Sequence, residues 1–370
     1  MKELGIYIHI PFCKKKCDYC DFISHCDKSN LIEEYIEKLK EEIESELNNK
    51  KYNITTIYIG GGTPSFIDSK YIVEILDIIK EKYDLGNTEI TIEVNPGTIT
   101  EKKLLDYKQA GINRLSIGLQ ETNNELLKQI GRIHTYEEFL ETYNLARKLG
   151  FENINVDLMI GLPSQSIKNI KESLNKVISL NPEHISVYSL ILEEGTKLYQ
   201  RYENDQIKLP DEELERNMYW YVKNTLENNG YNHYEISNFS KKGYESKHNM
   251  NCWEQKEYIG FGLNAHSYVD GVRFSNTENL EEYINKADKI IHEKQTIEDM
   301  QKEYMLLGLR KIDGVSIQKF EEKFVENPIF LFRNELNKLV KEELLEIDGD
   351  IIKLTNKGLD LANIVWEEFI

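Results

Sequence analysis

Three of the five cysteines in this 370-residue chain lie close together, at Cys13, Cys17 and Cys20 in the stretch FCKKKCDYCDF. A structural zinc site takes four protein ligands, and a disulfide framework uses an even number of cysteines in a small secreted domain. A cubane iron-sulfur cluster takes one thiolate per iron, so three thiolates would leave a fourth iron open to another ligand. The spacing alone leaves open such a cluster, a zinc knuckle completed by Cys26 or His25, and reduced thiols in a loop.

The composition limits the partners of the chain. It carries 46 Lys and Arg against 64 Asp and Glu, a formal net charge of -18, which would repel nucleic acid and anionic membrane surfaces. The sequence shows no signal-peptide pattern and no apolar run long enough to span a membrane, so we expect a cytoplasmic protein that does not bind nucleic acid. Clustered cysteines in that reducing compartment are more often metal ligands than disulfides.

The first half of the chain must position these cysteines. Short β-rich runs alternate with helical stretches up to about residue 192, which is typical of an α/β fold with a parallel sheet and crossover helices. Six strands predict a partial (β/α)6 barrel or an open wound sheet, and functional residues gather beyond the carboxyl ends of the strands in both. The cysteine loop directly follows the first strand. The predicted strands are 5–10, 55–60, 89–94, 114–119, 154–161 and 184–190.

The pattern changes twice along the chain, and we therefore expect three parts. Residues 1–192 would form the barrel, and residues 193–298 an aromatic, loop-rich extension that contains the motif HNMNCW. Residues 299–370 read as helices with a two-stranded wing, because Asp348-Gly349 is a hairpin turn signal. Acidic residues outnumber basic ones in this last part, so DNA binding by the winged-helix-like domain is not expected.

Polar residues follow several of the predicted strands. The glycine run GGGTPS at 60–65 follows the second strand, and its missing side chains would let the backbone approach a ligand, although a tight turn explains it equally well. Glu93 lies in an apolar run, where an ionised carboxylate is costly unless it is paired or bound. Gln120, Arg132 and Asp157 come at or after the next two strands. These residues are predicted to converge on one mouth of the sheet.

Taken in order, these motifs resemble the radical S-adenosylmethionine (SAM) enzymes, and within them the oxygen-independent coproporphyrinogen III oxidase group. The resemblance spans nearly the whole chain and disfavours the zinc knuckle. The motifs that carry it are Tyr7, HIPFC, C-x3-C-x2-C, GGGTPS, NRLSIGLQ, GRIH, VDLMIGLPSQ, YEISNF, GLNAHSY and LTNKGLDLANIVWEEF.

The resemblance implies the cofactors. In that family the three cysteines hold a [4Fe-4S] cluster, the amino and carboxylate groups of SAM chelate its free iron, and one electron from the cluster cleaves a carbon–sulfur bond of SAM. An electron donor is therefore an expected partner if SAM is cleaved. The SAM contacts implied by position are Tyr7, Gly61, Gly62, Thr63, Glu93, Gln120, Arg132 and Asp157.

The chemistry of these residues suits the assignment. Backbone groups of 61–63 can take the methionine amino end, and the planar fork of Arg132 can match a carboxylate. Gln120 and Asp157 can form hydrogen bonds with ribose hydroxyls.

Two branches of the group share these motifs. The oxidases have a further cysteine where this chain has Phe22, and a longer N-terminal extension. Both departures resemble the other branch, the haem chaperone HemW, which implies that haem is bound as cargo and handed to acceptor proteins such as membrane respiratory enzymes. The alternative is a SAM-dependent decarboxylase of coproporphyrinogen III in porphyrin biosynthesis.

The haem chaperone branch also has a motif linked to haem binding, which here reads HNMNCW. His248 and Trp253 are in place, and Cys252 stands where the family has tyrosine. The resemblance makes His248 a candidate haem ligand. Cys252 is either a small packing residue, the reading favoured here, or a second iron ligand, because thiolate and imidazole both bind haem iron.

Overall fold

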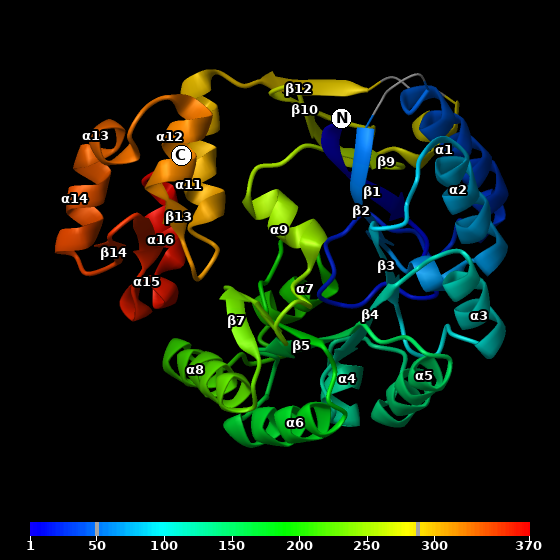
Figure 1. Cartoon of the computed structure of the whole chain (residues 1–370). Coiled ribbons are helices and arrows are strands. Elements are labelled where there is room, and N and C mark those ends of the chain that lie inside the picture. The colour runs from blue at the N-terminus through cyan, green and yellow to red at the C-terminus, as the bar shows by residue number, and fades with distance from the viewer. Residues whose placement is uncertain (49–51, 286–288) are drawn as a thin grey trace.

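The computed structural model describes residues 1–48, 52–285 and 289–370. Six parallel strands, all predicted from the sequence, curve into an open barrel with helices on its outer side (Figure 1). The strands are β1 (Lys2–Ile10), β2 (Tyr52–Gly61), β3 (Glu89–Val94), β4 (Arg114–Gln120), β5 (Ile154–Ile160) and β6 (His184–Ser189). The helices that follow or cover them are α1 (Ile32–Glu46), α2 (Ser69–Lys82), α3 (Glu101–Gln109), α4 (Asn124–Gln129), α5 (Tyr136–Lys148), α6 (Ile167–Ser179) and α8 (Glu212–Asn228).

Alternation of side chains along the strands separates the hydrophobic core from the barrel interior. On β2, Ile57 and Ile59 belong to the core between sheet and helices. Thr56, Tyr58 and Gly60 alternate with them and face inward, because successive side chains of a strand point to opposite faces. The barrel interior is therefore lined by polar and aromatic groups that run from one end of a strand to the other.

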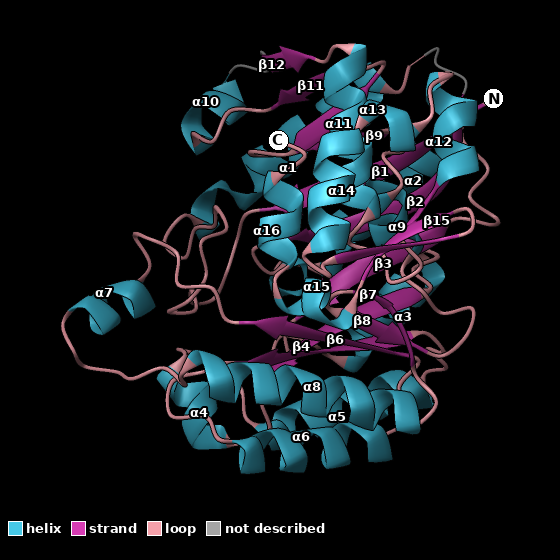
Figure 2. Cartoon of the chain, turned by 90° about the vertical axis from the view of Figure 1, so that its left-hand side faces the viewer, coloured by secondary structure: helices cyan, strands magenta, loops and turns pink. Residues whose placement is uncertain are grey.

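The region 193–298 is more regular than the sequence indicated, and it extends the same sheet at both edges. The strand β9 pairs in parallel with β1, and β8 pairs antiparallel with β6. Its strands have only three to five residues, too few for a clear alternation, which is why the sequence suggested loops. Besides α8, its elements are α7 (Lys197–Glu203), β7 (Asn232–Glu235), β8 (Asn238–Ser240), α9 (Lys247–Trp253), β9 (Tyr258–Phe261), β10 (His266–Val269), β11 (Val272–Ser275), α10 (Leu280–Asn285) and β12 (Ile290–Lys294). Figure 2 shows α7 standing out from the body of the molecule.

The C-terminal part has its own hydrophobic cluster, which includes Phe320 and Val365. The hairpin predicted at Asp348-Gly349 is confirmed, and Gly349 takes the left-handed conformation (φ 59°) that such a turn favours. The elements are α11 (Ile297–Gly308), β13 (Val315–Ser316), α12 (Ile317–Phe324), α13 (Pro328–Leu331), α14 (Arg333–Lys341), β14 (Leu345–Asp348), β15 (Ile351–Leu354), α15 (Asn356–Asp360) and α16 (Ala362–Glu367). The division into 1–192, 193–298 and 299–370 remains a proposal, in which the middle part completes the sheet of the first.

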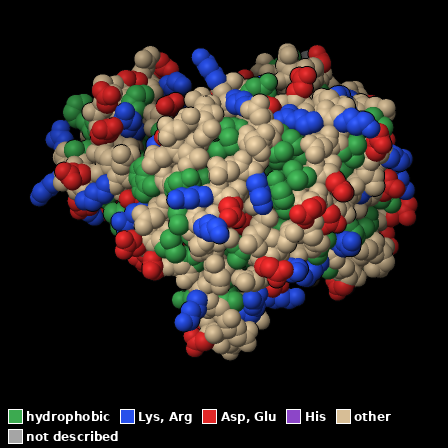
Figure 3. Space-filling model, turned by 90° about the horizontal axis from the view of Figure 1, so that it is seen from below, with side chains coloured by type: hydrophobic (Ala, Val, Ile, Leu, Met, Phe, Trp, Pro, Cys, Tyr) green, Lys and Arg blue, Asp and Glu red, His purple; other side chains and the backbone are tan. Residues whose placement is uncertain are grey.

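The outer surface is mixed in character. On the face shown in Figure 3, Lys and Arg side chains are interspersed with Asp and Glu side chains, and hydrophobic side chains form small groups between them. Among the helices in the described parts of the chain, none has the length and apolar character needed to cross a membrane.

Candidate functional site

A cavity of about 520 Å³ opens at the carboxyl ends of the parallel strands, and we refer to it as the mouth cavity. It is the place where the sequence predicted that the functional residues would meet. The predicted residues that line it are Cys13, Cys17, Cys20, Gly61, Gly62, Thr63, Glu93, Gln120, Arg132 and Asp157.

The cysteine loop is fixed by its own backbone. The amide of Cys13 donates to the carbonyl of His25 (3.0 Å), and the amide of His25 donates to the carbonyl of Pro11 (2.7 Å), which closes the base of the loop. Asp18 ties the middle of the loop to the carbonyl of Ile130 (3.0 Å). All three thiols are free; Cys13 is buried, and Cys17 and Cys20 are half-buried. The fold thus holds three thiols at one side of the mouth cavity without using them in disulfides.

The glycine run packs directly against this loop. A Cβ atom at Gly62 would lie 3.0 Å from the Sγ atom of Cys13, and one at Gly61 would lie 2.5 Å from the ring of His9. The amides of Gly62 and Thr63 donate to carbonyls before the cysteine loop, those of Ile10 (2.9 Å) and Phe12 (2.9 Å). These N–H groups are therefore occupied, and carbonyl oxygens are the groups of this run that could accept from an amino group.

Arg132 reaches the cavity from the segment after α4. Its Nη2 donates to the carbonyl of Gly118 (2.5 Å), and its Nη1 lies 3.5 Å from the Sγ atom of Cys17. A Cβ atom at Gly118 would lie 3.1 Å from the guanidinium, so the glycine leaves room for it. The Nε atom of Arg132 is buried without a hydrogen-bond partner among the described residues, as is the Oδ1 atom of Asn95 on the same cavity wall. Both atoms thus lie beneath the cavity surface and have no partner there.

Gln120 stands at an irregularity of the sheet. The register of β4 against β5 shifts between Gly118 and Gln120, and Gln120 has a φ of 72°, a left-handed conformation that is rare outside glycine. Such a bulge redirects a side chain at the end of a strand. Here it presents Gln120 to the mouth cavity.

Two carboxylates form the floor of the cavity. Glu93 accepts hydrogen bonds from the hydroxyl of Tyr58 (3.0 Å) and the amide of Gly61 (3.2 Å), and burial raises its pKa to about 7. Asp157 accepts from Asn155 (2.7 Å) and Ser116 (3.3 Å); burial raises its pKa, and these hydrogen bonds oppose the shift. Both carboxylates are thus held in place and directed at the same space.

The donor set fits an iron-sulfur cluster with an attached polar ligand. Burial raises the pKa of Cys13 and raises that of Cys20 to about 11, so iron binding would displace protons from these thiols. Across residues 1–48, 52–285 and 289–370, no group of three or more His, Cys, Asp or Glu side chains is arranged to hold a single metal ion. A cluster differs from such a site, because it distributes its thiolates over separate irons.

Tyr7 does not line the mouth cavity, although the resemblance placed it among the SAM contacts. Its hydroxyl shares a hydrogen bond with the Nδ1 atom of His9 (3.0 Å), and its ring stacks on that of Tyr58 at 6.3 Å between centroids. Tyr7 thus supports a cavity residue from beneath.

His248 also lies away from the mouth, in α9, where the sequence suggested a loop. Its ring is buried in the barrel interior, where the Nδ1 atom shares a hydrogen bond with the hydroxyl of Thr56 (3.0 Å) and the imidazole stacks on Tyr58 at 5.1 Å. Burial, with the positive charge of Arg114, lowers the pKa of His248 to about 4. The imidazole is therefore neutral at physiological pH, the form that binds iron.

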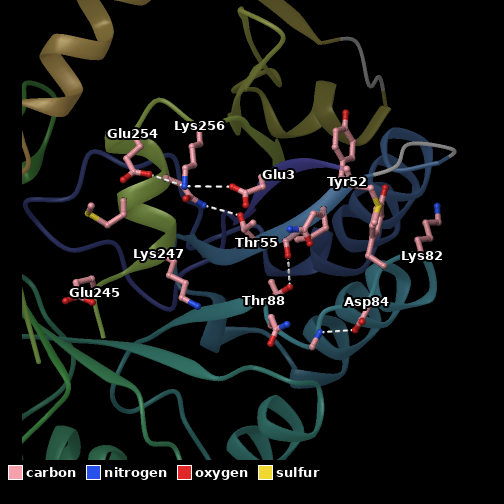
Figure 4. A pocket seen from close by; sticks show the side chains of 18 of the residues that line it. Glu3, Tyr52, Thr55, Lys82, Asp84, Thr88, Glu245, Lys247, Glu254 and Lys256 are labelled. Carbon is pink, nitrogen blue, oxygen red and sulfur yellow. Dashed lines mark hydrogen bonds and ion pairs between the residues drawn. The ribbon is translucent and has the colours of Figure 1, made fainter. Parts of the chain in front are cut away.

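The other face of α9 forms the wall of a second cavity, of about 910 Å³, at the amino ends of the strands (Figure 4). Lys247, Met250 and Glu254 line this cavity, at the spacing of one helix face. His248 and Cys252 are four residues apart and share the opposite face. Two axial haem ligands must approach iron from opposite sides, so these two side chains cannot both bind one iron while α9 stays helical.

Several cavity residues were missed by the sequence analysis. Tyr58, Ser116 and Tyr188 line the mouth cavity together with the predicted residues. Tyr58 precedes Gly60 by two positions, and Ser116 precedes Gly118 by two. The two-residue period of a strand was therefore the signal that could have found both of them.

Comparisons with known proteins agree with this geometry. The model of the radical SAM superfamily matches residues 7–177, and that of the HemN C-terminal domain matches residues 296–361. The chain is 40% identical to "Heme chaperone HemW" of Lactococcus lactis subsp. lactis (strain IL1403), over 100% of this chain and 98% of the relative. It is also 40% identical to "Heme chaperone HemW" of Bacillus subtilis (strain 168), over 98% of each chain.

Among solved structures, that of coproporphyrinogen III oxidase (HemN) from Escherichia coli superposes with a TM-score of 0.87. It is 24% identical, and the match covers 100% of this chain and 90% of the other, which establishes the radical SAM barrel fold with its C-terminal domain. The full-length identity to the curated relatives decides the branch. The chain belongs to the HemW family of the radical SAM superfamily.

Proposed function

We propose that this protein is a haem chaperone, which binds haem as cargo, passes it to acceptor proteins, and carries a [4Fe-4S] cluster and SAM at the mouth cavity. The observation that carries the proposal is the 40% identity over the full chain to proteins named "Heme chaperone HemW". Two further features support it: Phe22 where the oxidases have another cysteine, and His248 in a nearly complete haem-linked motif.

The cofactors follow from membership of the radical SAM superfamily. We assign the cluster to Cys13, Cys17 and Cys20, because these three free thiols border one cavity. When bound, the cluster and SAM supply one-electron chemistry that no side chain provides. An electron donor is then a further partner if SAM is cleaved.

We assign the SAM contacts to the opposite wall of the same cavity. Arg132 is placed to pair with the methionine carboxylate, because its guanidinium reaches the cavity wall. Carbonyls of the glycine run are suited to the amino group. Gln120 and Asp157 are suited to the ribose hydroxyls, Glu93 fixes the glycine run through the amide of Gly61, and Tyr7 supports the floor through Tyr58.

Haem itself is assigned to His248, whose neutral imidazole is the proposed iron ligand. Acceptors would be haem proteins, with membrane respiratory enzymes as the class that the family resemblance suggests, and the site of action would be the cytoplasm. The second candidate function is SAM-dependent decarboxylation of coproporphyrinogen III, which the fold of the Escherichia coli oxidase favours.

Anaerobic reconstitution of the cluster, followed by haem titration and a decarboxylation assay, tests the proposal. We expect retained haem and no carbon dioxide from coproporphyrinogen III. The variant His248→Ala should shift the haem absorption spectrum and weaken binding, because loss of an axial imidazole changes the ligand field. The exposed His292 provides the matched control, since His292→Ala should change neither. If the protein decarboxylates coproporphyrinogen III with matching consumption of SAM and retains no haem, the oxidase function would replace the chaperone function as the proposal.

A further inference from the structure

His248 cannot bind haem in the position that the structure shows. The side chain is 8% exposed and lines neither the mouth cavity nor the cavity at the amino ends of the strands. Haem is a flat macrocycle, and an axial ligand must stand clear of its own surroundings so that the ring can lie across it. At 8% exposure, His248 does not offer that clearance, because its ring is packed on Tyr58 inside the barrel.

Two residues of β2 hold the imidazole there. The hydroxyl of Thr56, which is fully buried, shares the hydrogen bond with Nδ1 (3.0 Å). The ring of Tyr58 lies almost parallel to the imidazole, at 5.1 Å and 27°. Space for this arrangement comes from Gly5 on β1, where a Cβ atom would lie 3.1 Å from the Thr56 hydroxyl oxygen.

The first turn of α9 is held as well. The carboxylate of Glu89, at the start of β3, accepts from the amides of Lys247 (3.2 Å) and His248 (3.2 Å). At the other end of the helix, the Arg310 guanidinium lies between the rings of Trp253 (4.4 Å) and Trp366 (4.8 Å). Both ends of α9 are thus held by contacts with other parts of the chain, and His248 provides the contact between its first turn and the barrel interior.

Tyr58 also belongs to the mouth cavity. Its hydroxyl donates to Glu93, which in turn accepts from the amide of Gly61 in the glycine run. One tyrosine therefore contacts both the floor of the proposed SAM site and the proposed haem ligand. The two sites are separated by a single aromatic ring.

Building on the haem chaperone function proposed above, we infer that His248 is docked in the barrel by Thr56 and Tyr58 and must leave it to bind haem iron. Thr56 and Tyr58 are then positioning residues that oppose haem binding. Because Tyr58 is hydrogen-bonded to Glu93, a ligand bound in the mouth cavity can change the stability of the docked position. Bound SAM fixes Glu93 and with it Tyr58, so it favours the docked imidazole and weakens haem binding. By linkage, haem weakens SAM binding by the same factor.

The neighbouring threonines of β2 give a matched pair of variants. Thr56→Val removes the partner of His248, and an unpaired buried nitrogen makes the docked position less favourable. Thr55→Val removes a hydroxyl that contacts Asn251 of the same helix (3.2 Å) but not His248. We expect Thr56→Val to bind haem about fivefold more tightly or better, with Thr55→Val unchanged. The gain should disappear in the double variant Thr56→Val/His248→Ala.

Other outcomes would overturn the inference. Weaker haem binding in Thr56→Val would mean that His248 binds iron where it lies, and equal binding in both threonine variants would mean that Thr56 does not hold it. A haem-free measurement separates this inference from the proposed function. Carbethoxylation of His248 by diethyl pyrocarbonate, followed by peptide mass spectrometry, should be slow in wild type and Thr55→Val and several-fold faster in Thr56→Val. Faster carbethoxylation in Thr56→Val, in a protein that retains no haem, would refute the chaperone function but support the docking of His248 by Thr56.

The role of Tyr58 is tested by titrating haem with and without saturating SAM on the reconstituted protein. In wild type we expect SAM to weaken haem binding at least threefold. Tyr58→Phe keeps the stacked ring but loses the bond to Glu93, so the ratio of the two affinities should fall to about one. A ratio of one in wild type, or the same ratio in both proteins, would contradict communication through Tyr58.

Discussion

At the carboxyl ends of the parallel strands, Cys17 and Arg132 face an open cavity, whereas His248, which enters from the amino ends, is buried against Thr56 and Tyr58. The mouth residues follow directly from the topology, because parallel strands bring their carboxyl ends together. The position of His248 depends on side chains far away in sequence. The proposed cofactor site is therefore ready for its ligands, while the proposed cargo ligand first has to be released.

The strongest test of the mouth site is the cluster itself. We expect Cys13→Ser, Cys17→Ser and Cys20→Ser each to abolish the [4Fe-4S] cluster, because each thiolate holds one iron. Anaerobic iron and sulfide analysis measures this directly. Cys26→Ser and Cys252→Ser are the controls and should retain full iron content. If the cluster survives Cys17→Ser but is lost in Cys26→Ser, the assignment of its three ligands is wrong.

The next largest effect concerns SAM. Arg132→Ala should weaken SAM binding by about hundredfold, since a buried charged hydrogen-bond donor to a carboxylate contributes about 1.5–3 kcal/mol. Equilibrium binding to the reconstituted variant measures it, with cluster content checked in parallel. Lys128→Ala, which removes an exposed charge on α4, is the control. Asp157→Ala should also weaken SAM binding, and unchanged affinity in both cavity variants would mean that the mouth is wrongly assigned.

A third test uses the carboxylate on the cavity floor. Burial raises the pKa of Glu93 from 4.5 to about 7, which corresponds to about 3 kcal/mol, and the adjoining cavity solvent reduces this to about 2 kcal/mol. Because the folded pKa is the higher one, this stability is present below pH 4.5 and is lost as pH rises through 7. Glu93→Gln should remove that loss. Urea unfolding of the cofactor-free wild type and Glu93→Gln at pH 5 and 8 measures how the free energy of unfolding changes with pH in each protein. The same change in both proteins would contradict a raised pKa of Glu93.

The smallest effect is expected at the far end of α9. Arg310→Ala should lower the free energy of unfolding by about 1.5 kcal/mol, because it removes two cation–π contacts in a partly buried site. Urea denaturation measures the change, and Arg333→Ala, which removes a single longer contact with Phe330 (5.7 Å), is the control. Equal stability of the two variants would show that Trp253 does not anchor the helix through Arg310.

Much of the mouth site could be predicted from sequence, since alternating strands and helices place Gly61, Gln120 and Asp157 at one edge of a sheet. The motif of α9 was found, but its orientation was not. KHNMNCW has seven residues, too few for a hydrophobic period to show which face is buried. The burial of His248 is decided by Thr56 and Tyr58, which lie almost two hundred positions earlier. No local pattern in the sequence could predict the contacts of His248 with these two residues.

The same long separations shape how the chain is made. β1 is paired on one side with β2 and on the other with β9, where Gly5 lies opposite Tyr258. During synthesis from the N-terminus, the outer edge of β1 therefore stays unpaired until about two hundred and fifty further residues have emerged. Contacts this distant slow folding, and an open edge strand can pair with another chain in the meantime. This edge of the sheet is thus completed late, and the first strand can pair with another chain until then.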